Sequence, residues 1–280
     1  KHVYNSIDEM AVILNHTQVK SSIEADGVVS ASQQGFHMKD CSLLSALNSL
    51  SYTPEGREII KNAFVYNEDK NTVTVNLPGF NISVDVKLRG SGGGINNSMG
   101  DIEPYALEEA LKVALKKVKN GEIKLSDDAP YWCKRPQDIE YIEVNALHPQ
   151  QIFYALTGME CNKRNDTTKE MKTWLNSFEQ NQNMALVAST YKEGTSTSRS
   201  QSGLIGTKDA FGNPITISRQ HAYAVKDVTT KTDGKRVITI VDPTDSSRQI
   251  VMKEDDFLKV FEAMDTIKLT NNNKHPQYYH

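Results

Sequence analysis

Apolar residues recur at helical spacing through much of the first two thirds of the chain. From Cys41 onward, Leu43, Leu44, Leu47 and Leu50 follow the i, i+3, i+4, i+7 pattern of a buried helix face. A glycine after "FYALT" and a threonine before "TKEM" are typical helix stop and start signals. The pattern predicts further helices at 6–16, 53–65, 103–118, 148–157 and 167–183. In the helix at 103–118 we expect the apolar side to comprise Leu107, Leu111, Val113, Ala114 and Val118.

Short stretches with alternating or continuous β-branched residues indicate strands. Two of them, at 71–78 and 81–88, follow one another within the helical region, and the others come after residue 183. The later strands are predicted at 184–190, 221–230, 236–243 and 248–254. This order favours an α+β fold with two lobes over a doubly wound sheet.

The organisation that we expect is an N-terminal extension at 1–30, a helix-rich lobe at 31–165, a β-rich lobe at 166–268 and a tail at 269–280.

The charge, the apolar stretches and the cysteine and histidine spacing disfavour several classes of protein. The net charge is -3 and the pI is about 6.2, which does not suggest a nucleic-acid partner or an anionic membrane. No stretch approaches 18 apolar residues, so we expect no membrane-spanning helix. The 3 cysteines lack CxxC spacing and the 7 histidines lack HxxxH spacing, so no structural metal site is predicted.

Cys41 is the first candidate for chemistry, because it stands where a helix is predicted to begin. A thiol is nucleophilic as the thiolate, which a helix N-terminus and a nearby imidazole both favour. A buried structural cysteine is the simpler interpretation of this residue on its own.

His221 and Asp242 are candidate partners for that thiol. His221 lies at the start of a predicted strand, and Asp242 ends the next strand, just before Pro243. A hairpin would bring the two ends together, so that the carboxylate could orient the imidazole. Gln34, seven residues before Cys41, is the candidate side-chain donor for an oxyanion.

These segments together resemble the catalytic core of calpain-like cysteine proteases, which share the papain fold. "QGFHMKDCSLLSAL" resembles the segment around the nucleophile of that family, and "HAYAV" resembles the segment around its histidine. "ITIVDPTD" stands where the family has a strand that ends in Asn-Pro-Trp, and the likeness covers roughly residues 30–265. The resemblance suggests a divergent, bacterial type of member.

The resemblance implies a papain-like fold, with Cys41 as nucleophile, His221 as general base and acid, and Gln34 in the oxyanion hole. Four positions depart from the family pattern. Ser42 replaces an aromatic residue, and the spacing from the glutamine to the cysteine is one residue longer, which leaves Gln33 as an alternative to Gln34. Asp242 replaces Asn, and Thr244 replaces the Trp that shields the pair, so we expect a wetter pair of His221 and Asp242.

The function that follows is a thiol endopeptidase acting on a protein or peptide substrate through a thioester. A Gly-rich loop with Gly92, Gly93 and Gly94 would line its cleft, or would be a plain linker. Two alternatives remain. The first is another Cys-His-Asp acyl enzyme, such as a transglutaminase, deamidase or effector acyltransferase, and the second is a binding module on an inactivated protease fold.

No cofactor is expected, although animal members of the family that the chain resembles need calcium. Two acidic stretches could supply oxygen ligands, one with Asp101 and Glu103 and one with Glu254, Asp255 and Asp256. Acidic residues also favour helix starts, and neither stretch has the order of a calcium-binding loop. Calcium is therefore an alternative, and activity without a metal is the expectation. The sequence makes no prediction about localisation.

Overall fold

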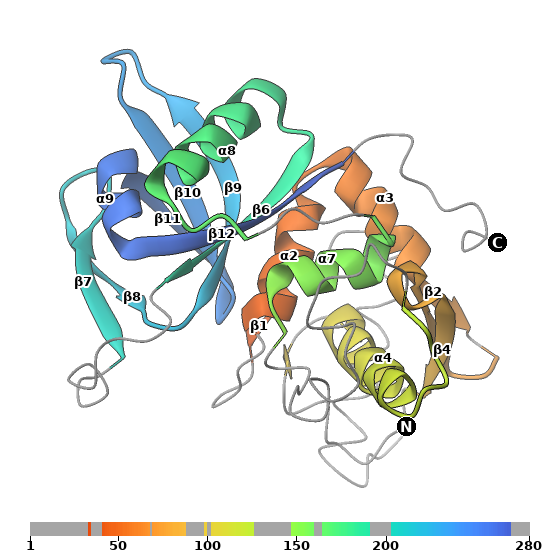
Figure 1. Ribbon diagram of the computed structural model, residues 1–280. Helices are drawn as coiled ribbons and strands as arrows, with labels where there is room; N and C mark the ends of the chain where they lie inside the picture. Colours follow the sequence, from red (N-terminus) through yellow and green to blue (C-terminus); the bar gives the residue numbers. More distant parts are fainter. Residues whose placement is uncertain are drawn as a thin grey trace, which may run out of the picture.

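The chain has two hydrophobic cores, one enclosed mainly by helices and one built on a β-sheet. Figure 1 shows the helices between residues 41 and 157 on one side and the strands between residues 184 and 268 on the other. The computed structural model describes residues 33–34, 41–67, 69–87, 98–99, 102–125, 147–159, 164–190 and 203–269. We refer to the elements before residue 160 as the helical part and to those after residue 164 as the sheet part.

The helical part contains four helices and a small sheet among its described residues. The helices are α2 (Cys41–Ser51), α3 (Pro54–Ala63), α4 (Ile102–Lys119) and α7 (Pro149–Thr157). The antiparallel sheet has the order β2 (Phe64–Asn67), β3 (Thr72–Leu77), β4 (Ile82–Lys87), with the short turn η1 (Pro78–Phe80) between its last two strands. A two-stranded pair joins β1 (Gln33–Gln34) to β5 (Ser98–Met99).

Local signals in the sequence set the ends of these helices. The Thr53 hydroxyl accepts a hydrogen bond from the Gly56 N–H at 3.0 Å, and Pro54 takes the first helical position of α3. Gly158 ends α7 in the left-handed conformation, with φ of 66°. These ends were predicted. The placement of Val113 on the apolar side of α4 is wrong, because Val113 is 37% exposed.

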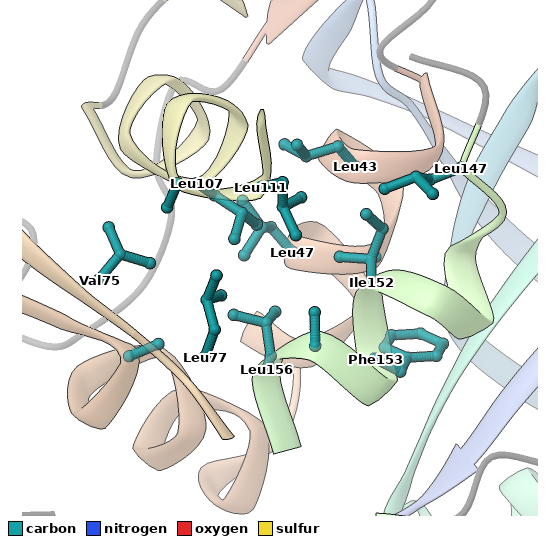
Figure 2. Close-up of a cluster of buried hydrophobic side chains, with 14 of the residues drawn as sticks. Leu43, Leu47, Val75, Leu77, Leu107, Leu111, Leu147, Ile152, Phe153 and Leu156 are labelled. Atoms are coloured by element: carbon teal, nitrogen blue, oxygen red, sulfur yellow. The ribbon is translucent and has the colours of Figure 1, made fainter. Parts of the chain in front are cut away.

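Side chains from all four described helices of the helical part, and from strands of both parts, meet in the first core. Figure 2 shows leucines of α2, α4 and α7 turned toward one another, with Val75 and Leu77 of β3 on a further side. Leu47 of α2 and Leu107 and Leu111 of α4 are fully buried there. Each buried leucine contributes roughly 1.5–3 kcal/mol through removal of its apolar surface from water.

The sheet part is built on five antiparallel strands in the order β11-β10-β9-β6-β12. These are β6 (Met184–Thr190), β9 (Ala222–Thr230), β10 (Arg236–Asp242), β11 (Asp245–Lys253) and β12 (Phe261–Lys268). The described residues also include α8 (Thr168–Asn181), α9 (Glu254–Val260) and the hairpin of β7 (Leu204–Lys208) and β8 (Pro214–Ser218).

The central sheet is covered on both faces. Along β6, Ala185 and Val187 belong to the first core, whereas Met184, Leu186 and Ala188 belong to the second. Side chains alternate between the faces of a strand, so one face packs on the helical part, where β6 and β9 contact α2. The other face packs on the second core, to which α8 contributes. The sheet is therefore shared between the two cores.

The α+β class that the sequence predicts is confirmed, as are the antiparallel strands at 184–190, 221–230 and 236–243. The hairpin β7–β8 and the edge strand β12 were not predicted. Seven of the eight residues of β12 are buried or half-buried, including Asp265 and Thr266, so its sequence shows no simple alternation. The helix predicted at 6–16 lies outside the described residues. Within the described part, no helix has both the length and the hydropathy that a membrane crossing requires.

Gly56 offers a test of the contact between α2 and α3. A Cβ atom at this position would lie 1.8 Å from the Leu50 carbonyl oxygen. Alanine normally favours a helix by up to about 1 kcal/mol over glycine. Here the steric overlap outweighs that gain, so we expect Gly56→Ala to lower the free energy of unfolding by about 1–3 kcal/mol in urea titrations.

Gly206→Ala is the matched control, because nothing lies within 4 Å of a Cβ atom there. It should change stability by less than about 0.5 kcal/mol. A Gly56→Ala protein as stable as the parent would show that the two helices separate easily.

Candidate active site

Cys41 is the first residue of α2 and is half-buried. The residues that follow, from Leu43 to Ser51, are all buried. The N–H groups of a first helical turn lack acceptors within the helix, and together they favour a negative charge beside them. The thiol therefore stands at the end of the helix that stabilises a thiolate.

Ser45 connects this helix to the sheet. Its hydroxyl donates a hydrogen bond of 2.8 Å to the backbone carbonyl of Ala222, the residue after His221. Ser45 follows Cys41 by four positions, so the two lie on the same face of the helix. This bond consequently sets the position of the thiol relative to the histidine.

The backbone of His221 is held by the end of a neighbouring strand. Its N–H donates to the Thr190 hydroxyl at 3.1 Å, and its carbonyl accepts from the Thr190 N–H at 3.0 Å. Gln220 before it has a φ of 49°, in the left-handed region. His221 thus enters β9 from a turn whose hydrogen bonds fix it to β6.

Asp242 ends β10 and is only 4% exposed. The pairing of β9 with β10 places Val241 opposite Ala224, and so brings the end of one strand beside the start of the other. Asp242 Oδ1 accepts hydrogen bonds from the N–H and the hydroxyl of Thr244, at 2.9 and 2.6 Å. Its Oδ2 lies 3.3 Å from a guanidinium nitrogen of Arg248.

The imidazole and the carboxylate face each other, with His221 Nε2 3.7 Å from Asp242 Oδ1. This is an ion-pair distance, longer than a hydrogen bond. The expectation of a wet pair is wrong, because the two side chains are 10% and 5% exposed. Tyr223 packs edge-on against the imidazole, with ring centroids 5.0 Å apart, and so shields the imidazole on that side.

Burial and charge shift the three ionisable groups in directions that suit an ion pair. Burial raises the pKa of the Cys41 thiol. The hydrogen bond and positive charge of His221, with a backbone hydrogen bond from Ala222, lower this pKa by more, so the net shift is downward. Burial lowers the pKa of His221, whereas Asp242 and Cys41 raise it to about 9. Asp242 keeps a lowered pKa, since contacts to His221 and Thr244 outweigh its burial.

The structure thus brings Cys41, His221 and Asp242 together. Gln34 lies in β1, a strand that contacts α2 and β11. The backbone of Gln34 pairs with Ser98, and the structure does not describe the Gln34 side chain. Gly92, Gly93 and Gly94 lie outside the described residues.

Four residues around the site were not identified from the sequence: Ser45, Thr190, Tyr223 and Arg248. Ser45 had a usable signal, because a small polar residue one turn after a candidate nucleophile shares its helix face. Thr190 had none, since it reaches His221 from a strand 31 residues earlier in the chain. Arg248 had none either, because its contact with Asp242 depends on the exact register of the hairpin of β10 and β11.

Asp101, one of the acidic residues considered for calcium, lies outside the described residues, and the others stand at helix starts. Glu103 is in the first turn of α4, and Glu254, Asp255 and Asp256 are in the first turn of α9. Glu254 accepts from Arg236 at 2.9 Å. In the part of the chain that the structure describes, no group of three or more His, Cys, Asp or Glu side chains could hold a metal ion.

Comparison of the sequence with models of known protein families and with curated proteins gave no match. The argument for a function therefore depends on the site itself.

The opposite pKa shifts lead to a prediction for the thiol. From these directions we expect both the thiolate and the imidazolium to be present above the lowered pKa of Cys41 and below about pH 9. We expect iodoacetamide at pH 6.5 to modify Cys41 at least about tenfold faster than a thiol with the ordinary pKa near 8.5. His221→Ala should remove most of that advantage. Mass spectrometry of each cysteine at limiting reagent gives the rates.

Cys133 and Cys161 serve as internal references in the same experiment. Equal rates at all three cysteines, or a rate at Cys41 that rises with one ionisation near pH 8.5, would contradict an activated thiol.

Proposed function

We propose that this protein is a thiol endopeptidase with a papain-like, calpain-related catalytic core. The observation that carries the proposal is the convergence of Cys41, at a helix N-terminus, with His221 and Asp242 at the ends of adjacent strands. The order of the three residues along the chain matches that of the family that the sequence resembles. An active site formed by a helix-rich part and a β-rich part is what that resemblance implies.

The proposed reaction is acyl transfer to Cys41. The thiolate sulfur attacks the carbonyl carbon of the scissile peptide, and a thioester forms as the carbon–nitrogen bond breaks. With Nε2 turned to Asp242, the other imidazole nitrogen of His221 donates its proton to the departing amine. Water, activated by the now neutral His221, then hydrolyses the thioester and restores the ion pair.

The negative oxygen of the tetrahedral intermediate needs hydrogen-bond donors. The N–H of Cys41, which begins the helix, is one, and the side-chain amide of Gln34 is the proposed second. The contact of β1 with α2 supports Gln34, because it brings the backbone of that residue to the helix that carries Cys41. The Gly-rich segment with Gly92, Gly93 and Gly94 is proposed to line the substrate path.

Hydrolysis of a fluorescently labelled unfolded protein tests the proposal. We expect Cys41→Ala to lower kcat/KM by at least about 10⁴-fold while the circular dichroism spectrum is unchanged, because the nucleophile is lost. New α-amino termini without release of ammonia indicate an endopeptidase. Release of ammonia from glutamine substrates would indicate a deamidase or transglutaminase instead.

The same assay examines calcium. The proposed steps use only side-chain and backbone groups, so we expect a chelator to leave the rate unchanged. Loss of most activity in chelator, with recovery in millimolar calcium but not magnesium, would overturn this expectation. A thiol that labels slowly in a protein without activity would favour the inactivated binding module.

Asp242 variants test the orienting role. Asp242→Ala removes the group that faces His221 Nε2, so we expect kcat to fall by about 10- to 10⁴-fold. Asp242→Asn keeps one oxygen for the imidazole and should retain more activity than the alanine variant. A wild-type kcat for Asp242→Ala would assign the orienting role to another residue or to none.

A further inference from the structure

Both carboxylate oxygens of Asp242 are engaged by hydrogen-bond donors other than His221. Oδ1 accepts from the N–H and the hydroxyl of Thr244, and Oδ2 accepts from Arg248 at 3.3 Å. Thr244 follows Asp242 by two residues, whereas Arg248 reaches it from the next strand. Each of these described contacts is a donor, so none of them requires a donating group at position 242.

The hairpin of β10 and β11 places Arg248 there. Val241 pairs with Gln249, so the residue before it on β11, Arg248, comes beside Asp242 at the end of the ladder. The register then becomes irregular, because Asp242 itself pairs with Asp245 and residues 246–248 are extra on β11. Irregularities of this kind recur beside active sites.

These donors make position 242 suitable for an acid and unsuitable for an amide. An asparagine side chain has one accepting oxygen and one donating nitrogen. If its oxygen stayed with Thr244, its NH₂ group would face the Arg248 guanidinium, and two donors would oppose each other. If it turned over, the NH₂ group would face the Thr244 N–H, which is a donor too, and only the Thr244 hydroxyl could accept from it. Either orientation therefore sets one donor against another, which is costly for a buried group.

We propose that Arg248 is a positioning residue that holds Oδ2 of Asp242. On this proposal, Arg248 is the reason why the residue that faces His221 is an acid rather than an amide. The inference rests on the proposed role of Asp242 beside His221. The Arg248 side chain is 49% exposed, so water screens its charge, and its effect comes mainly from directing the carboxylate.

A rescue experiment tests this role through Cys41 itself. The rate of iodoacetamide alkylation of Cys41 at pH 6.5 is measured in Arg248→Gln, Asp242→Asn and the double variant. Arg248→Gln keeps a donor for the carboxylate, so its rate should stay within about threefold of wild type. Asp242→Asn alone should be about tenfold slower. In the double variant, the glutamine amide can turn its oxygen to the asparagine NH₂ group, and the rate should return to within about threefold of wild type.

Two further combinations are the controls. Asp242→Asn with Arg248→Lys keeps a charged donor opposite the amide and should show no recovery. Asp242→Asn with Arg236→Gln should show none either, because Arg236 begins β10 and bonds Glu254 at 2.9 Å. Thermal unfolding of all variants separates a change in rate from a change in folding.

The outcomes distinguish this inference from the proposed function. Recovery in the glutamine combination alone supports the inference, whether or not any variant hydrolyses peptides. A double variant as slow as Asp242→Asn, or slower, overturns the role of Arg248 even if the protein is a peptidase. Recovery with lysine or with Arg236→Gln would also overturn it, because the effect would then not depend on an acceptor at position 248.

Discussion

The burial of α2 in the first core, against the central sheet, is the constraint on which the rest of the structure depends. Every residue from Leu43 to Ser51 is buried, with α4 and α7 on one side and β6 and β9 on the other. A helix packed on all sides has little freedom to shift or rotate, because interiors are filled almost as densely as crystals. Cys41 lies in the first turn of α2, so the position of Cys41 beside the sheet is fixed by the packing of the helix.

An ion pair of Cys41 and His221 beside the buried helix α2 requires that the two side chains are held at a fixed separation and orientation. Removing a thiolate and an imidazolium from water is costly unless they compensate each other and keep their hydrogen bonds. The backbone contacts of Ser45 with Ala222 and of Thr190 with His221 supply that geometry without taking up the reacting groups. The shielding by Tyr223 then makes the attraction between the charges stronger than it would be in water.

The surroundings of Asp242 and His221 come from different strands. A carboxylate at position 242 carries a charge that an amide would not, and it accepts from Thr244 and Arg248. Thr244 follows Asp242 closely in the chain and caps the carboxylate. Shielding of the imidazole comes from β9, through Tyr223, so two different residues cap the carboxylate and shield the imidazole.

The sequence by itself determined the helices α2, α3, α4, α7 and α8, the hairpin of β9 and β10, and the candidates Cys41, His221 and Asp242, because helical spacing, alternation and capping are local properties of the chain. Only the tertiary structure decided that Ser45 binds Ala222, 177 residues away, and that Arg248 binds Asp242 where the hairpin of β10 and β11 becomes irregular. The tertiary structure also decided the edge strand β12. Both faces of β12 are buried, so apolar and polar residues do not alternate along its sequence. Such contacts depend on how the elements pack, and packing brings together residues that no local pattern connects.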